Sequence, residues 1–545
     1  MILPSDPDER EAFYLDIIDK CYVSREERKS DYLSLRSYYL FGSGPEEAPA
    51  HYNKIYPHID QLTAFLYSAD TTRFSISLGA SVKPTEHAKV PVLAQALNDE
   101  WANSNADQIA SMALTWALVY CSTFVKLVRR PGGVVPYMVD PGSIGVLRED
   151  IPYTDRQEAM CQAYFITRAE LNRRLYSHPK RDLLIKRITS SEKKPSDIPN
   201  AVNRIVMSAT NPTIYGNVNL DLSGVNRLRP QVAEDMIEMR ELYVYNDELQ
   251  DYQMVTMAEP GVVIFDRPLW NKDVNKAVFL KGELPFIHFN PNPQWDYYWG
   301  QSEVSRLVYL QEMRNKRMSE ILDLLSKQVN PPTALTGWSG ILDERNFALN
   351  RAGGLLATDM PNAKVEKLAP DMPPDLYKEI AEIDAMFAEA SGISSILSGR
   401  GESGVRSSGH ASQLARLGSS RAKKRALIVE DALEKMATMY LRLMQIDDET
   451  IYRDSNGTAF IAEQFTKDFV VKVDAHSNSP IFMEDLRSLA FSLFKAQAID
   501  KESLLDLLEP PMKQLLKEKL KKAEAEKATK PEAQPSAPPQ AKKAG

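Results

Sequence analysis

The chain has 545 residues, of which 43% are hydrophobic and 26% charged, and its formal net charge at pH 7 is −8. This length exceeds one ordinary hydrophobic core, so the sequence predicts two or more domains or one elongated fold. The acidic balance argues against a general nucleic-acid-binding protein, because affinity for phosphate groups needs a basic surface. Cys21, Cys121 and Cys161 are odd in number and scattered, which argues against a disulfide framework and indicates a reducing compartment.

Helical patterns dominate the first part of the chain. They cover residues 6–40, 53–67 and 90–121, and the last of these is interrupted near residues 102–105. Residues 72–78 alternate as a strand does. The helix over 53–67 carries one apolar stripe, formed by Ile55, Ile59, Leu62, Phe65 and Leu66.

Strand patterns follow from residue 124. Two apolar runs flank Pro131-Gly132-Gly133 and predict a hairpin, in which Pro136 places the second strand at a sheet edge. Residues 168–176 predict a helix with Thr167 as its N-cap, and residues 190–230 read as loop. Further strands are expected at 143–147, 159–166, 239–245, 252–258 and 261–265.

The longest helical pattern runs from residue 302 to residue 328, about 40 Å at 1.5 Å per residue. Pro331 and Pro332 end it, and a module rich in Pro, Gly and Trp follows over 329–374, with a strand expected at 353–357. A second helix is predicted over 375–391, with Ile380, Ile383, Met386 and Phe387 as its buried stripe. A glycine-serine loop (398–409) and a long helix (411–445) complete this region.

The C-terminal part mixes short elements with a low-complexity tail. Residues 450–473 carry short strand patterns, and residues 483–522 are helical in at least two pieces. Beyond residue 522 the chain is rich in Lys, Ala, Glu, Pro and Gln, so it cannot bury apolar surface and is expected to be disordered.

Motifs for catalysis are not found in this sequence. It has no phosphate-binding Gly-x-x-x-x-Gly-Lys-Ser/Thr loop, no His-Glu-x-x-His and no Cys-x-x-Cys, so neither an enzyme nor a metal site nor a cofactor is expected. Gly399, Gly401 and Gly404 follow a helix instead of a strand, and they indicate a hinge. An enzyme would need a carboxylate cluster, and the dense acidic set here is expected on the outer face of a helix: Asp371, Asp375, Glu379 and Glu382.

Two side-chain clusters leave alternatives open. Residues 400–425 hold seven basic residues and one acidic residue. This segment is either a solvated helix face or a loop and helix start that face a phosphate backbone, with weak contacts independent of sequence. The aromatic residues Trp295, Tyr297, Tyr298 and Trp299 favour a packing hub over a base-stacking platform.

The order of these parts resembles the portal proteins of tailed bacteriophages. The resemblance rests on Trp299-Gly-Gln-Ser-Glu-Val-Ser followed by a helix (299–316), on Asn330-Pro-Pro and Gly353-Gly354, and on Ser391-Gly-Ile-Ser394 before a loop and a long helix. The helix over 53–67 and the hairpin ending in Val139-Asp-Pro are also similar to portal features.

The resemblance implies an α+β, mainly helical fold with portal-type parts. These are a wing (1–300), a stem helix (301–328), a clip (329–374), a second stem helix (375–391), a tunnel loop (392–410), a long helix with the rest of the wing (411–480), a helical crown (481–522) and a disordered tail (523–545).

The resemblance also implies a function. The expected protein forms a ring, twelvefold in this family, at one capsid vertex of the virion, and it is assembled in the host cytoplasm. The ring is a passive channel for double-stranded DNA during packaging and ejection. Expected partners are the terminase large subunit, head–tail adaptor or tail proteins, and the major capsid and scaffolding proteins, with no membrane.

Residues are carried over to these roles by their place in the sequence. In the clip, Trp338, Phe347 and Arg351 are expected to meet partner proteins. The alternative is a capsid scaffold or adaptor protein that forms no DNA channel. Expected to face DNA, from the tunnel loop and the helix start, are Arg400, Arg406, Ser407, Ser408, His410, Arg416, Lys423 and Lys424.

Overall fold

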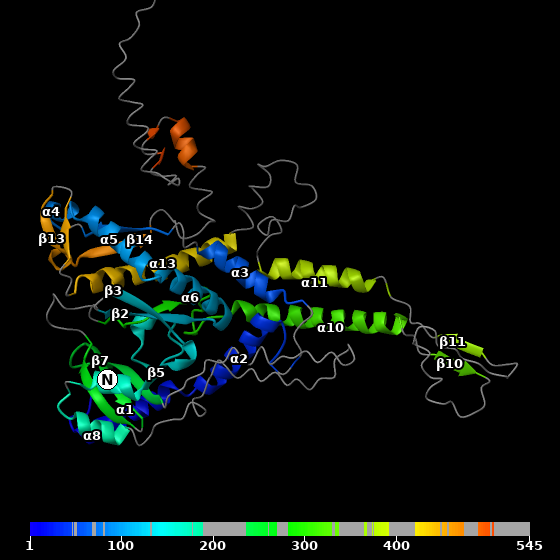
Figure 1. Ribbon diagram of the computed structural model, residues 1–545, viewed down its shortest axis with the longest axis horizontal. Helices are drawn as coiled ribbons and strands as arrows, with labels where there is room; N and C mark the ends of the chain where they lie inside the picture. Colours follow the sequence, from blue (N-terminus) through cyan, green and yellow to red (C-terminus); the bar gives the residue numbers. More distant parts are fainter. Residues whose placement is uncertain are drawn as a thin grey trace, which may run out of the picture.

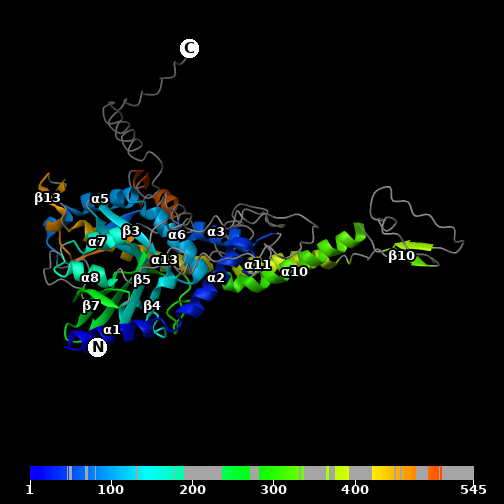
Figure 2. The ribbon, with the colours of Figure 1, turned by 60° about the horizontal axis from the view of Figure 1, so that its bottom comes forward.

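The computed structural model describes most of the first 329 residues and selected segments beyond them. It covers 1–188 without 46, 48–51, 68–71, 80–81, 131–132 and 177, and 236–329 without 260 and 270–281. It also covers 333–336, 364–367, 373, 375–391, 420–473 without 447–449 and 455–456, and 489–505 without 497 and 502–503. These residues form an α+β body from which an arm of two helices projects (Figures 1 and 2).

Four of the six N-terminal helices, α2, α3, α5 and α6, contribute to one large core, whereas α1 packs against a five-stranded sheet. The predicted stripe of α3 is confirmed for Ile55, Ile59, Leu62 and Leu66, which are buried, whereas Phe65 is partly buried. Asn53 lies two residues before α3 and stabilises its first turn, because Asn53 Oδ1 accepts a hydrogen bond of 2.9 Å from the backbone N–H of Ile55. The helices are α1 (Pro7–Cys21), α2 (Arg25–Phe41), α3 (Ile55–Leu66), α4 (Pro84–His87), α5 (Val90–Asn103) and α6 (Ala106–Tyr120).

A five-stranded antiparallel sheet forms the other side of the body, in the order β4-β5-β6-β7-β8. All of its strands were predicted, and each predicted strand end lies within three residues of the observed one. Thr167 caps α7 (Arg168–Arg174), since its Oγ1 accepts a hydrogen bond from the N–H of Glu170 at 3.2 Å, and α8 (Arg181–Ile188) follows. The strands are β4 (Ile144–Val146), β5 (Ala159–Thr167), β6 (Met236–Asn246), β7 (Asp251–Ala258) and β8 (Val262–Pro268).

A second sheet carries the predicted hairpin. It has the order β3-β2-β9, formed by β3 (Gly133–Val139), β2 (Thr123–Arg130) and β9 (Ile287–Phe289). β3 lies at the edge of this sheet, so the prediction of an edge strand is confirmed. Pro136 fits there because it has no backbone N–H to donate to a second neighbouring strand. β9 comes directly before the arm, and its pairing with β2 fixes where the arm leaves the body.

The arm consists of α10 (Glu303–Val329) and α11 (Asp375–Ser391), which lie side by side. Both helices were predicted within one residue. Beyond the far end of the arm, β10 (Thr333–Thr336) and β11 (Lys364–Lys367) pair as an antiparallel ribbon (Figure 1).

The chain returns to the body through α13 (Ser420–Met444), which packs on α3, α5 and several strands. Residues 411–419 of the predicted long helix lie outside the described residues. After α13 come β12 (Ile451–Arg453), β13 (Ala459–Ile461) and β14 (Phe469–Val473). Because β14 pairs with β1 (Phe74–Leu78), segments nearly 400 residues apart in the sequence share one core.

Other predictions fall largely on residues that the structure leaves out. The loop expected over 190–230, the strand at 353–357, the tail from residue 523 and most of the crown lie outside the described residues. Within 489–505, residues 489–495 are helical. The domain boundaries taken from the resemblance therefore remain predictions.

Candidate functional site

The junction between the body and the arm begins at a turn that requires glycine. Gly300 has φ +74°, and a Cβ on it would lie 2.4 Å from Asn290 Oδ1 and 2.7 Å from the carbonyl oxygen of Asn292. Two residues on, Ser302 Oγ donates a hydrogen bond of 2.6 Å to the carbonyl oxygen of Val119 at the end of α6. The start of α10 is thereby fixed to the body by backbone contacts.

Glu303, the first residue of α10, is a buried carboxylate that joins three helices. Its side chain is 1% exposed, and Arg425 of α13 lies 2.9 Å from it. His58 of α3 lies 3.6 Å away, and Arg306 lies 3.5 Å away. Burial alone raises the pKa of Glu303, but the close approach of His58 and the charges of Arg425 and Arg306 outweigh it, so the pKa is lowered and the carboxylate stays charged.

This pairing corrects the reading of the basic segment 400–425. Arg425 is one of its seven basic residues, yet its side chain is only 11% exposed and is bound to Glu303 inside the body. The sequence offered no local signal for this, because the partner carboxylate lies more than one hundred positions earlier. Arg425 therefore holds α13 to the arm and does not face solvent.

An aromatic cluster lies beside the junction. Tyr298 and Trp299 are 0% and 1% exposed, and the guanidinium of Arg28 lies 3.8 Å from the centre of a Trp299 ring. Trp299 Nε1 donates a hydrogen bond of 2.8 Å to Glu149. The packing-hub interpretation is confirmed for this pair, whereas Trp295 is 87% exposed and belongs to no buried cluster.

His288 of β9 is the polar centre of the same cluster. Its ring stacks on both Phe124 and Tyr298, with centroid distances of 4.6 and 4.9 Å. Its Nε2 lies 2.8 Å from Ser122 Oγ. Burial, with a smaller contribution from the charge of Lys435, lowers the pKa of His288 from 6.5 to about 3, so the ring is neutral at physiological pH.

The arm helices are held together by ion pairs on either side of an apolar contact. Arg314 and Arg317 of α10 lie 3.0 Å from Asp384 and 2.8 Å from Glu379 of α11, respectively. Lys54 of the body reaches the same Asp384 at 2.9 Å, which ties the arm to the segment before α3. Ile383 and Phe387 of α11 belong to the same buried hydrophobic cluster as Val304 and Leu307 of α10, and Ile321 of α10 is also buried.

Two predictions about α11 are wrong. Met386 is 48% exposed instead of buried, because the face of α11 that packs on α10 is centred on Ile383 and Phe387 and Met386 lies beside it. Glu379 does not lie on the outer face, because it points to Arg317 of the neighbouring helix. In the same acidic set, Asp375 forms an exposed ion pair with Lys378 at 3.0 Å, and Asp371 lies outside the described residues.

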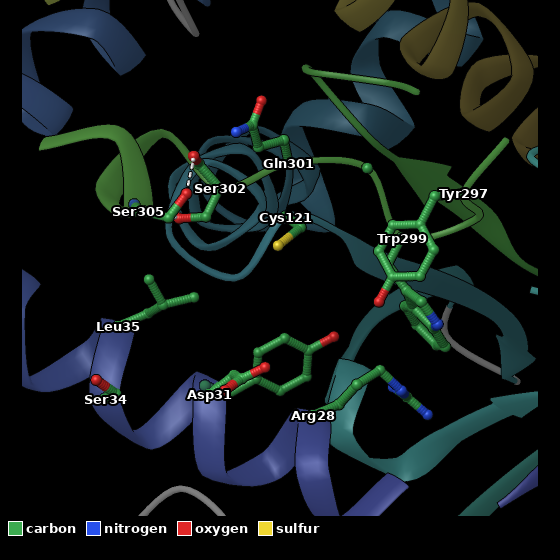
Figure 3. Close-up of a pocket in the computed structure, with 12 residues that line it drawn as sticks. Arg28, Asp31, Ser34, Leu35, Cys121, Tyr297, Trp299, Gln301, Ser302 and Ser305 are labelled. Atoms are coloured by element: carbon green, nitrogen blue, oxygen red, sulfur yellow. Dashed lines mark hydrogen bonds between the residues drawn. The ribbon is translucent and has the colours of Figure 1, made fainter. Parts of the chain in front are cut away.

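A pocket of about 320 Å³ lies between α2 and the turn that leads into α10 (Figure 3). Asp31 and Leu35 line it from α2, while Cys121 and Ser302 line the opposite side. Cys121 has φ +80°, a backbone conformation that is strained for a residue with a side chain. Burial raises the pKa of the Cys121 thiol to about 12, so this thiol is not an activated nucleophile at neutral pH.

Most predicted site residues lie in segments that the structure leaves out. Lys424 is exposed in the first turns of α13, and the backbone of Lys423 belongs to the same helix. Neither the tunnel-loop set nor the clip set can therefore be placed. Outside the described residues are Arg400, Arg406, Ser407, Ser408, His410, Arg416, Trp338, Phe347 and Arg351.

Neither a metal-binding cluster nor a membrane-spanning helix is found in the described part of the chain. Within it, no group of three or more His, Cys, Asp or Glu side chains is placed to hold a metal ion. In the same residues, no helix combines the length and the apolar character needed to cross a membrane.

Comparisons with known proteins give structural likeness without sequence likeness. No family model matches the sequence, and no curated protein matches it. A chain of the virion of a native gene transfer agent (GTA) particle is similar over 88% of this chain and 94% of that chain, with 11% identity and a TM-score of 0.41. A chain in the neck of an empty GTA particle, computed with C6 symmetry, gives the same coverage and identity with a TM-score of 0.39. At these scores the likeness assigns neither a family nor a function to this chain.

Proposed function

We propose that this chain is the subunit of a portal ring at one vertex of a phage-like capsid. The ring is a passive channel for double-stranded DNA during packaging and ejection, and it is a docking site for other virion and packaging proteins. The proposal joins the order of parts in the sequence, which resembles portal proteins, with the arrangement of the described elements. Its location is the virion, and it has no enzymatic activity of its own.

The arm is the observation that carries this proposal. α10 and α11 project from the α+β body as an antiparallel pair, and the β10–β11 ribbon lies beyond their far end (Figures 1 and 2). This order of helix, ribbon and helix supports the proposed assignment of stem, clip and stem, which the resemblance implies. A rod of two helices has little surface to bury by itself, so its natural use is to pack beside copies of itself.

Exposed apolar side chains on the arm support assembly from many copies. Tyr309 of α10 is 69% exposed, and Tyr377 and Met386 of α11 are 54% and 48% exposed. Large apolar side chains that are exposed on a projecting element are typical of protein–protein contact. In a ring, each arm would lie between two neighbours and would cover such residues.

The distribution of charge supports a channel that does not trap DNA. The chain is acidic overall, so a ring of many copies repels a DNA duplex. With Arg425 bound inside the body, six basic residues of the segment 400–425 remain as candidates for weak backbone contacts with DNA, and exposed Lys424 is one of them. Partners proposed from the resemblance are the terminase large subunit, head–tail adaptor or tail proteins, and the major capsid and scaffolding proteins.

Electron microscopy of the purified full-length chain tests the proposal. Negative-stain images with symmetry averaging should show rings with a central hole about 20 Å or more across, enough for a DNA duplex. A spherical or filamentous particle, or a stable monomer at all concentrations, would overturn the portal proposal. The first two outcomes would favour a capsid scaffold or adaptor protein without a channel.

A further inference from the structure

Cys21 and Cys161 come from distant parts of the sequence and meet in one buried cluster. Cys21 is the last residue of α1, and Cys161 lies in β5 of the five-stranded sheet. Both residues belong to the same buried apolar cluster, and they are 2% and 0% exposed. The third cysteine, Cys121, lines the pocket at the base of the arm. The structure thus separates one cysteine pair from one single cysteine, which their spacing in the sequence does not reveal.

The backbone around this pair is closely packed. Cys161 is the register partner of Gly145 across β4 and β5, so their Cα atoms lie about 4.5–5.5 Å apart. A Cβ on Gly145 would lie 2.6 Å from the carbonyl oxygen of Cys21 and 2.8 Å from the ring of Tyr22. Glycine at this position therefore lets the end of α1 descend onto the strand pair. The end of α1 thereby lies against β4, next to the strand that carries Cys161. A disulfide between them would need about 4.4–6.8 Å between the two Cα atoms.

The closed structure protects both thiols from oxidation. They lie in an apolar cluster with Tyr14, Ile18 and Leu242. The neighbouring Cys161 and burial both raise the pKa of Cys21, so its reactive thiolate is scarce at neutral pH, and Cys161 is shielded from oxidants because it is fully buried. Reaction therefore requires α1 to open from the sheet. An N-terminal helix opens more readily than the strands on which it lies, because fewer elements cover it.

We propose that Cys21 and Cys161 form an intramolecular disulfide when the protein passes from a reducing to an oxidising compartment, and that this bond fastens α1 to the sheet. The oxidant is a small disulfide of the glutathione class. One cysteine thiolate attacks it and forms a mixed disulfide, and the first glutathione leaves as a thiol. The second cysteine then attacks the protein sulfur of the mixed disulfide, and the second glutathione leaves. Two protein thiols are oxidised, the oxidant is reduced to two thiols, and the two cysteine protons pass to the leaving groups.

Peptide mapping of the full-length protein tests the bond. The protein is purified with reductant, desalted, incubated with glutathione disulfide, alkylated in denaturant and digested with trypsin without reduction. Trypsin places the three cysteines in separate peptides, Cys21–Arg25, Val90–Lys126 and Gln157–Arg168. The first and third should be recovered joined, at a mass two hydrogens below their sum. Cys121→Ser should give the same joined peptide, and Cys161→Ser should give none.

Hydrogen exchange tests the consequence for α1. Amides of residues 7–21 should exchange at least tenfold more slowly in oxidised than in reduced wild-type protein. If Cys161→Ser does not fold by near-ultraviolet circular dichroism, Cys21→Ala takes its place, and the wild-type comparison stands by itself. Three outcomes would overturn the proposal. Both cysteines are recovered alkylated and unlinked although the α1 amides exchange, or the disulfide joins Cys121 or a second chain. The third is that the α1 amides exchange equally fast in the linked and the reduced protein.

Discussion

Glu303 carries its charge in a position almost closed to solvent, and the neighbouring side chains explain how. Arg425 and Arg306 lie within ion-pair distance, and His58 approaches from α3. A buried ion pair is weak evidence for stability in itself, since desolvation offsets much of the attraction. Removing only one partner is costly, however, because the other charge remains buried without compensation.

For this reason Glu303→Gln should destabilise the protein strongly. The variant keeps the shape of the side chain and leaves the buried Arg425 without its carboxylate, so we expect the free energy of unfolding to fall by about 3–5 kcal/mol. Urea denaturation followed by circular dichroism measures it. Asp431→Asn is the matched control, because Asp431 and Lys435 form an ion pair in α13 in which the two side chains are 65% and 70% exposed. Its effect on the free energy of unfolding should stay within about 0.5 kcal/mol. Similar small losses in both variants would show that the buried pair contributes little.

His288 predicts a pH dependence of stability. Its pKa falls from 6.5 in the unfolded chain to about 3 in the fold, so between these values the unfolded chain binds a proton that the folded protein does not. The contribution of the neutral ring is complete above pH 6.5 and is lost as pH falls toward 3, by up to about 1.4 kcal/mol per pH unit. His288→Gln should make the slope of unfolding free energy between pH 6.5 and 4.5 shallower by about that amount. Replacing the exposed His87 by Gln should leave the slope unchanged, and a wild-type slope in His288→Gln would contradict the assignment.

At the scale of elements, the arm depends on a narrow contact between two helices. Ile383 is 1% exposed and Phe387 is 6% exposed, while the neighbouring Met386 is 48% exposed. The ion pairs Arg314–Asp384 and Arg317–Glu379 flank this contact. α11 should therefore be able to separate from α10 without unfolding of the body.

Ile383→Asp should release α11, because it places a charge in the apolar contact. Amides of residues 375–391 should exchange at least a hundredfold faster, while those of α6 in the core keep their protection. Ala385→Asp introduces the same charge two residues away at an exposed position of α11, and it should leave exchange near the wild-type rate. Equal effects of the two substitutions would mean that α11 is not held by this contact.

At the scale of the whole molecule, the proposed ring depends on the exposed flank of the arm. Tyr309→Glu places a charge at a position that is 69% exposed in one chain and is covered in the proposed ring. It should weaken assembly at least tenfold in sedimentation velocity, with the melting temperature of the monomer unchanged. Tyr176→Glu is the control, since Tyr176 is 79% exposed on the body, next to α7. Normal assembly of Tyr309→Glu would exclude this flank as the interface.

The basic segment can be tested in assembled particles. Replacing Arg406, Arg416, Lys423 and Lys424 by Ser should spare ring assembly and change the amount of nuclease-protected DNA per particle, because the proposed backbone contacts are lost. Unchanged packaging would show that the segment is a solvated face. The control removes four exposed basic residues elsewhere, namely Lys20, Arg173, Lys186 and Lys435.

Local patterns predicted the elements well and their partners poorly. The stripe of α3, the Thr167 cap and the ends of α10 and α11 follow from side chains within a few positions of one another, so the sequence was sufficient for them. The pairing of β1 with β14, of β2 with β9, and of Cys21 with Cys161 joins residues far apart in the chain, and no local pattern records it.

Exposure was the other quantity that periodicity could not supply. Met386 and Trp295 are apolar, and a pattern alone assigns them to a core. Whether they are covered depends on which face a neighbouring element reaches. Arg425 is the opposite case, since it is a charged residue in a basic run that a pattern assigns to the surface. Its side chain is only 11% exposed, and it pairs with Glu303, far away in the sequence.

Gly300 gives the junction a mechanical meaning. A side chain there would collide with Asn290 and Asn292, so a substitution has to rotate the peptide that aims α10. A helix of this length extends about 40 Å, and a change of about 10° in its direction displaces the far end by about 7 Å. A small rotation of the backbone at Gly300 would therefore move the far end of α10 by more than the width of a side chain. The position of the β10–β11 ribbon therefore depends on how Gly300 fits at the base of α10.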